Sequence, residues 1–231
     1  MKRFWTEARA QPELDFWAVR LDGKPMRLPG GAALRIPTPT LAHAIAAEWA
    51  AAGEDMTYAD VPLTRIAGTA QERVAPAAEA VALELARYGA SDLLCYRAEQ
   101  PLELVAAEAA AWDIWLDWAA ATYGARLAVG SGIVHVPQPP EASIALAGAV
   151  ARCDTATLAG LGIIVPALGS LVLGLAVAAE AITPEDAHAT SALDELYQAA
   201  LWGEDEEAAD GRAAVARDVA DAARYIRLSR A

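Results

Sequence analysis

The first forty residues alternate between apolar and polar positions, a pattern typical of short, half-buried strands. Residues 18–21 and 26–28 show this alternation on either side of Asp22-Gly23, a dipeptide that favours a tight hairpin because it tolerates positive φ angles. Residues 34–36 repeat the pattern after a Pro-Gly-Gly turn. The segment is therefore predicted to form a small antiparallel meander with one apolar face.

A helix is predicted directly after the meander. Thr38 is a suitable N-cap, and Pro39 suits the first helical position because it needs no N–H donor there. The apolar face of this helix consists of Leu41, Ile45 and Trp49, and Gly53 marks its end. Residues 56–63 are then predicted to be extended.

From residue 69 onward, apolar residues recur mainly at helical spacing. One helix is expected to bend at Pro76 and stop at Gly89, and a long one is expected over residues 102–123. The predicted core face of the long helix comprises Leu102, Val105, Ala109, Trp112, Leu116 and Ala119. A later helix begins at Thr183-Pro184, and the last has acidic residues near its start and arginines towards its end.

These patterns predict an α+β protein. A small antiparallel β-meander plus helix at the N-terminus is followed by a mainly α-helical C-terminal domain. The composition changes near residue 68, so the expected domains are residues 1–68 and 69–231.

One uncharged stretch, residues 155–179, is long enough to be compared with a membrane span. It contains Pro166 and four glycines, and it is flanked by Asp154 and Glu180 rather than by basic residues. Two buried helices with a break near Pro166 are therefore the favoured interpretation, with a membrane-attached segment as the alternative.

The composition limits the possible partners. The formal net charge is −13, with 18 basic and 31 acidic residues, which argues against binding to nucleic acid or to an anionic lipid surface. Glu7, Arg9, Glu13 and Asp15 interrupt any apolar run after Met1-Lys2-Arg3, which argues against a secretory signal. Cys95 and Cys153 are expected to be buried thiols in a reducing compartment, which favours a cytoplasmic protein.

Catalytic and cofactor signatures fail when they are tested against the sequence. The Gly160-Leu161-Gly162 segment lacks the remainder of a phosphate-binding loop, and no His-Glu-x-x-His or Cys-x-x-Cys motif occurs. A calcium loop centred on Gly211 would place Arg217 at the bidentate position. No cofactor, metal or catalytic residue is therefore predicted.

Charge is distributed very unevenly along the chain. Between Arg152 and Arg212 there are eleven acidic residues and no lysine or arginine. Such a segment is either a solvated face or a surface that attracts a basic partner. Within it, Glu195, Gln198 and Trp202 share one side of a predicted helix, opposite Leu193, Leu196, Tyr197 and Ala200. Trp202 is then either an interface anchor or a core residue folded back after Gly203.

Several blocks of sequence resemble the ATP synthase assembly chaperones that serve the alpha subunit of the catalytic head (the Atp-twelve family). These blocks are Leu21-Asp22-Gly23-Lys24-Pro25, Glu48-Trp49, Pro62-Leu63-Thr64-Arg65, Ser91 to Ala98, Trp112-Asp113, Leu116-Asp117-Trp118, Gly169 to Leu173, and Leu193-Asp194-Glu195 with Gln198 and Trp202 to Glu207. Gly68 and Glu72 depart from the family pattern, which usually has Asn and Asp there, and Pro166 stands where the family pattern has a more regular helix.

The resemblance implies a non-enzymatic protein that binds the unassembled alpha subunit and prevents its aggregation until the beta subunit joins. It implies a bacterial cytoplasmic location here and the mitochondrial matrix for eukaryotic relatives. The client-binding residues expected from the resemblance and from the helix pattern are Asp194, Glu195, Gln198, Trp202, Asp205 and Glu207. Two alternatives remain open: a metal-dependent enzyme that uses Asp194, Glu195, Asp205 and Glu207, or a membrane-attached assembly factor. The sequence does not determine the oligomeric state.

Overall fold

The computed structural model describes residues 2–231, and its internal contacts divide them into two compact units. Unit 1 contains the N-terminal residues up to Ala78 together with Asp154–Gly160 and Asp221–Ala231. Unit 2 contains Glu79–Cys153 and Leu161–Ala220. Unit 1 includes the antiparallel sheet, whereas unit 2 is mainly helical, as the predicted α+β class requires.

The sheet of unit 1 has the strand order β1-β2-β3 and is antiparallel throughout. The strands are β1 (Ala8–Pro12), β2 (Trp17–Leu21) and β3 (Lys24–Pro25). Asp22 and Gly23 form the predicted hairpin turn, with φ angles of 47° and 77°. The prediction missed β1, and the expected strand at residues 34–36 is reduced to a bridge between Ile36 and Trp17.

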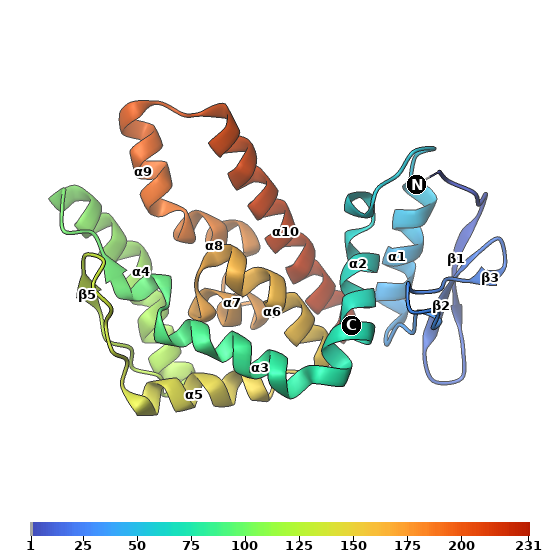
Figure 1. Ribbon diagram of the computed structural model, residues 1–231, viewed down its shortest axis with the longest axis horizontal. Coiled ribbons are helices and arrows are strands. Elements are labelled where there is room, and N and C mark those ends of the chain that lie inside the picture. Colours follow the sequence, from blue (N-terminus) through green and yellow to red (C-terminus); the bar gives the residue numbers. More distant parts are fainter. Residues whose placement is uncertain (1) are drawn as a thin grey trace. The chain divides into compact units, whose positions relative to one another are not determined.

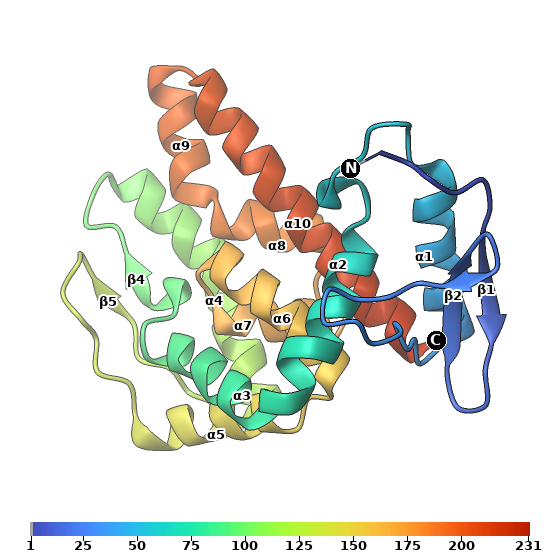
Figure 2. The same ribbon diagram turned by 45° about the vertical axis from the view of Figure 1, so that its right-hand side comes forward.

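Helix α1 (Pro39–Ala51) packs on β1 and β2, as Figure 1 shows. Its predicted start is confirmed, because the Thr38 hydroxyl accepts a hydrogen bond from the N–H of Leu41 at 3.2 Å. Its predicted apolar face is also buried. Figure 2 shows the same sheet and helix after a rotation of 45°.

The prediction that residues 56–63 are extended is wrong. Thr57 and Asp60 form a capping box around a short 3₁₀ turn, η1 (Tyr58–Asp60), and α2 (Pro62–Thr69) begins directly after it. The Asp60 carboxylate accepts a hydrogen bond from the N–H of Thr57 at 2.6 Å. Polar side chains that bond to nearby backbone groups compete with strand formation, and they do so here.

The predicted bend at Pro76 is a local change in helix type. A π-helical turn, η2 (Ala70–Val74), is followed by a 3₁₀ turn, η3 (Ala75–Ala77), which contains Pro76. Helix α3 (Ala78–Ala86) and the 3₁₀ turn η4 (Arg87–Ala90) continue the chain. Proline lacks the N–H of a regular helix, so the hydrogen-bond pattern adjusts around it.

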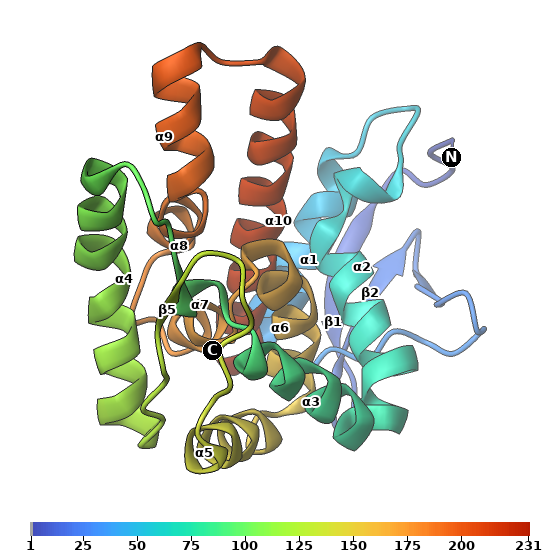
Figure 3. The ribbon, with the colours of Figure 1, turned by 60° about the vertical axis from the view of Figure 1, so that its left-hand side comes forward.

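Unit 2 consists mainly of helices, which Figure 3 shows from another side. Residues 93–97 form a 3₁₀ turn, η5 (Leu93–Cys95), and a short strand, β4 (Tyr96–Arg97). Strand β4 pairs in parallel with β5 (Gly130–Ser131). The remaining elements are the helices α4 (Leu102–Tyr123), α5 (Pro140–Ala151), α6 (Thr155–Leu168), α7 (Leu171–Ala178), α8 (Pro184–Ser191), α9 (Leu193–Trp202) and α10 (Glu206–Arg230). The first turn and a half of α6 and the end of α10 belong to unit 1.

Helix α4 has the predicted bounds but a different core face. Leu102 is 77% exposed, which corrects the prediction that it is buried. The fully buried residues of α4 are Leu104, Glu108, Trp112, Leu116 and Ala119. A buried glutamate therefore occupies a position on the apolar stripe of α4.

The uncharged stretch is two helices with a break near Pro166, as predicted, and the break lies three residues after the proline. Helix α6 continues past Pro166, and the chain turns at Gly169, whose φ angle is 63°. Pro166 has no N–H group, so the carbonyl of Gly162, four residues earlier, lacks its helical hydrogen bond. Gly162 is exposed to solvent, which makes the proline tolerable at this position. The Ser170 hydroxyl then caps α7 by accepting a hydrogen bond from the N–H of Leu173 at 3.0 Å.

Candidate functional site

Helix α9 presents apolar side chains to solvent. No residue of α9, all of which the structure describes, is fully buried. The predicted buried face is wrong for Leu196 and Ala200, which are exposed. Leu201 is 58% exposed and Trp202 is 79% exposed, so Trp202 does not fold back onto the core. This end of α9 has the composition of a protein-binding surface.

The predicted polar residues of the site have different surroundings. Glu195, Gln198 and Glu207 are exposed. Asp205 is also exposed, but its carboxylate accepts a hydrogen bond from the N–H of Ala208 at 3.4 Å and so lies at the N-terminus of α10. Glu195 and Glu207 are therefore the exposed carboxylates of the predicted site that do not cap a helix, and we refer to them as the acidic rim.

Arg212 on α10 pairs with Glu204, in the link between α9 and α10, and with Glu195, in the first turn of α9. Its Nη2 lies 2.6 Å from a carboxylate oxygen of Glu204, and its Nη1 lies 3.8 Å from a carboxylate oxygen of Glu195. The Arg212 side chain is 13% exposed, whereas both carboxylates are largely exposed. The arginine therefore offsets part of the negative charge of these two carboxylates.

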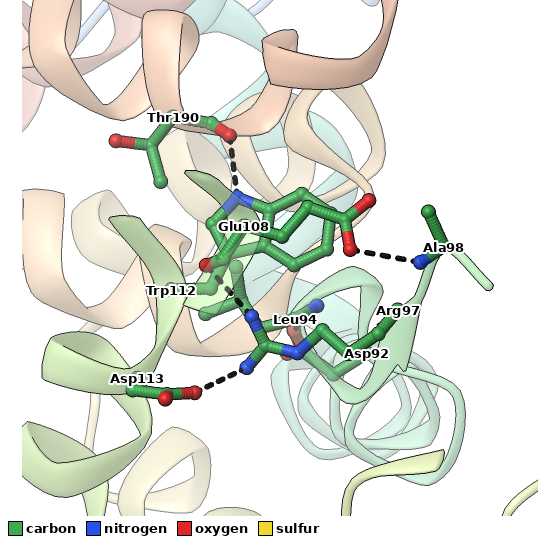
Figure 4. A network of polar contacts seen from close by, with 8 residues as sticks. All are labelled: Asp92, Leu94, Arg97, Ala98, Glu108, Trp112, Asp113 and Thr190. Atoms are coloured by element: carbon green, nitrogen blue, oxygen red, sulfur yellow. Dashed lines mark hydrogen bonds and ion pairs between the residues drawn. The ribbon is translucent and has the colours of Figure 1, made fainter. Parts of the chain in front are cut away.

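Arg97 and Glu108 lie at the centre of a buried polar network in unit 2 (Figure 4). The guanidinium of Arg97 donates to the backbone carbonyl of Glu108 at 2.7 Å and to the Asp113 carboxylate at 2.6 Å. It also lies over the Trp112 ring, 5.0 Å from the centroid. The Glu108 carboxylate accepts a hydrogen bond from the N–H of Ala98 at 2.8 Å. This network joins α4 to the segment around β4.

Asp194, the remaining predicted site residue, is half-buried and pairs with Glu108. Burial, together with the hydrogen bond and the negative charge of Asp194, raises the pKa of Glu108 from 4.5 to about 7. The Oε1 of Glu108 and the Oδ1 of Asp194 are buried and have no N–H donor. Two carboxylates cannot hydrogen-bond unless one of them holds a proton, so Glu108 holds the proton of this hydrogen bond below neutral pH.

Sequence reasoning did not identify Glu108 or Arg97 as part of this site. The only signal for Glu108 was its spacing of four residues from both Leu104 and Trp112, which places it on their face of the helix. The network changes the interpretation of Asp194, which holds α9 against α4 rather than standing on an exposed rim.

The proton held by Glu108 predicts a pH-dependent stability. The pKa of Glu108 is higher in the folded state than in the unfolded state, so the folded protein holds more protons between about pH 4.5 and 7. The contribution of this pair is therefore present at the acidic end of that range and is lost as the pH rises through it. We expect Glu108→Gln, whose amide can donate to Asp194 at any pH, to remove this part of the pH dependence.

Urea denaturation at a series of pH values from mildly acidic to mildly alkaline would measure the difference between Glu108→Gln and the wild type. Groups common to both proteins cancel in this difference. Glu79→Gln, at an exposed position on α3, is the matched control and should follow the wild-type profile. Parallel profiles for Glu108→Gln and the wild type would rule out a proton held by Glu108.

A metal-dependent enzyme would need a cluster of ligand side chains, and a membrane-spanning segment would need a long apolar helix. Within residues 2–231, no group of three or more His, Cys, Asp or Glu side chains is placed to hold a metal ion. No helix in that range is both long enough and apolar enough to cross a membrane. Among the acidic residues near α9, Asp205 caps α10 and Glu204 pairs with Arg212.

Comparison with known proteins identifies the family. The family described as ATP12 chaperone protein matches residues 2–120, and a crystal structure of Atp12 from Paracoccus denitrificans has 44% sequence identity with a TM-score of 0.94. The alignment covers 99% of this chain and 98% of that one. The chain belongs to the ATP12 chaperone family.

Two further solved structures extend the comparison. An Asp-to-Lys variant of the Paracoccus Atp12 has 43% identity and a TM-score of 0.94, covering 99% of this chain and 97% of that one. A candidate chaperone from Agrobacterium tumefaciens has 37% identity and a TM-score of 0.91, covering 97% of this chain and 84% of that one. The structural matches extend beyond residue 120, so the ATP12 fold includes α9 and α10. Membership in the ATP12 family gives this chain the role of an assembly chaperone.

Proposed function

We propose that this ATP12-family chaperone binds the unassembled alpha subunit of an F-type ATP synthase in the bacterial cytoplasm and releases it when the beta subunit joins. The observation that supports this function best is the exposed end of α9, where Leu201 and Trp202 stand beside several carboxylates. No enzymatic step is part of the proposal.

The apolar side chains at the end of α9 supply the contact area. An orphan subunit exposes apolar surface that is covered in the finished assembly, and such surface promotes aggregation. Trp202 offers a large contact area at a small cost in side-chain entropy. We assign it the role of anchor, with Gln198 as a polar neighbour on the same helix.

The carboxylates around this anchor set the choice of partner. Glu195 and Glu207 are exposed and can pair with basic groups of the client, which favours rapid encounter more than tight binding. Asp194 and Asp205 act indirectly in this proposal, because the first pairs with Glu108 and the second caps α10. Modest affinity suits a chaperone that the beta subunit must displace.

Co-precipitation with newly made alpha subunit tests the proposed client. We expect capture of free alpha and its loss when beta is added. A protein that does not capture alpha at low salt, or that retains it in the presence of beta, would contradict the proposal.

The acidic rim predicts a salt-sensitive loss of binding. Neutralising Glu195 and Glu207 together, by Glu195→Gln and Glu207→Gln, should weaken alpha binding by about threefold to tenfold at low salt and by less at high salt. The measurement is the association rate and Kd over a range of salt concentrations. The double variant Glu79→Gln with Glu103→Gln changes the charge equally at exposed sites on α3 and α4 and should bind as the wild type does. Equal losses in both double variants would point to net charge alone.

A further inference from the structure

Unit 1 contains a groove of about 910 Å³ that the proposed function does not use. One wall comes from the β2–β3 hairpin and the segment that follows it, and the other comes from α2 and the π-helical turn η2. The buried side chains of Leu21, Met26 and Leu28 line it, together with the exposed Lys24, Arg27 and Arg73. Phe4 and Tyr58 are 75% and 62% exposed, so two aromatic side chains stand at its margin.

The two walls of the groove are held together by specific contacts. The Glu72 carboxylate accepts a hydrogen bond from the N–H of Gly30 at 2.9 Å, which joins η2 to the loop after β3. A Cβ atom at Gly68 would come within 3.0 Å of the Leu28 side chain, so glycine allows these walls to approach. The π-helical turn places Glu72 and Arg73 on the same wall, and such turns often occur at functional sites. The groove is therefore a formed feature of unit 1.

The charge of the groove is opposite to that of the rest of the molecule. Residues 1–78 contain nine basic and nine acidic residues, whereas residues 79–231 contain nine basic and 22 acidic residues. Four of the basic residues line the groove, and the single acidic residue there, Glu72, bonds to Gly30. Lys24, Arg27 and Arg73 are all exposed. A rim of this charge around an apolar floor favours an anionic partner with apolar groups.

The polar groups of the groove suit a polypeptide better than a small molecule. Small-molecule sites usually have buried polar groups that converge on the ligand. The buried Thr64 hydroxyl instead accepts a hydrogen bond from Trp49 Nε1 at 2.8 Å and lies 3.2 Å from a carboxylate oxygen of Glu48. Exposed aromatic residues beside exposed cations are typical of protein interfaces.

We propose that this groove is a second docking site, which binds a polypeptide segment that carries both apolar and acidic side chains. The apolar residues of the segment lie on the Leu21, Met26 and Leu28 floor, and its carboxylates pair with Lys24, Arg27 and Arg73. This site is separate from the acidic end of α9, and its ligand has the opposite charge. The chaperone then has one surface for basic segments and another for acidic segments.

Fluorescence anisotropy with synthetic peptides tests the groove in the full-length protein. The probes are short peptides rich in Leu and Phe that also carry Glu, with matched peptides in which Glu is replaced by Gln or by Lys. We expect the Glu peptides to bind most tightly. Thr69→Trp introduces a bulky side chain from an exposed position in the groove and should weaken this binding by about tenfold or more.

Two charge variants separate the groove from the overall charge. Lys24→Gln with Arg73→Gln should weaken binding of the Glu peptide by about threefold to tenfold at low salt and reduce its salt dependence. Lys2→Gln with Arg9→Gln removes the same charge from exposed positions of unit 1 outside the groove and should leave binding unchanged. Thermal denaturation of each variant establishes that unit 1 remains folded.

Equal binding of the Glu and Lys peptides, or no effect of Thr69→Trp on a folded protein, would overturn the proposal. Binding of laurate but of no peptide would also overturn it and assign the groove to small amphiphiles. Because the probes are synthetic peptides, the result does not depend on whether the client is the alpha subunit. A failure to capture alpha with normal peptide binding would contradict the proposed function alone.

Discussion

Replacing Trp202 with alanine should weaken binding of the alpha subunit by about tenfold to a hundredfold and leave the chaperone folded. Large exposed aromatic residues often dominate the binding energy of an interface, and the loss of one costs about 2 kcal/mol or more. Trp202 is 79% exposed in the free protein, so its removal should change the free energy of unfolding by less than about 0.5 kcal/mol. Titration of purified alpha subunit with wild type and variant, followed by denaturation of each, measures both quantities.

Leu102→Ala is the matched control for Trp202→Ala. Leu102 is also in unit 2 and is 77% exposed, but it lies at the start of α4. Its truncation removes exposed apolar surface without changing the end of α9, so we expect alpha binding to be unchanged. If the two variants bind alpha equally well, Trp202 is not the anchor.

Asp92→Ala should lower the free energy of unfolding by about 3 kcal/mol, the largest stability effect expected for a single polar side chain in this fold. Asp92 is fully buried, and burial raises the pKa of its carboxyl. Its two oxygens accept hydrogen bonds from the N–H groups of Leu94 at 3.1 Å and Val172 at 3.0 Å. Alanine would leave these buried donors at the starts of η5 and α7 without their acceptor. Urea denaturation measures the loss.

An exposed helix cap provides the comparison for Asp92. The Thr183 hydroxyl accepts a hydrogen bond from the N–H of Asp186 at 3.1 Å at the start of α8. Water can replace this bond, so Thr183→Ala should cost only about 1 kcal/mol. Similar losses for Asp92→Ala and Thr183→Ala would show that burial adds little to the role of the Asp92 cap.

Local signals in the sequence predicted several helix ends well. The long helix at residues 102–123 and the capped starts at Thr38 and Thr183 are confirmed. These features depend on nearby residues: a glycine with positive φ at position 124 ends α4, and short polar side chains satisfy free N–H groups at the other two sites. Strand β1 was missed because Ala8–Pro12 contains no β-branched or aromatic residue and is defined by its pairing with β2.

Burial was harder to predict than helix position, because it depends on which elements pack together. Leu102 and Leu196 were assigned to core faces but are exposed, while Glu108 occupies a buried position that suits a leucine by spacing. The place of Asp194 could not be predicted for the same reason, since its partner is 86 residues away in the sequence. The exposure of Trp202 excludes the alternative, left open by helix periodicity, in which this side chain folds back onto the core.

The carboxyl pair formed by Glu108 and Asp194 also affects how heats of unfolding are interpreted. Because the folded chain still holds part of an extra proton near neutral pH, unfolding there releases a fraction of a proton to the buffer. The calorimetric enthalpy consequently includes the protonation heat of the buffer and differs between phosphate and Tris. An enthalpy measured in one buffer is therefore not the intrinsic enthalpy of unfolding for this chaperone.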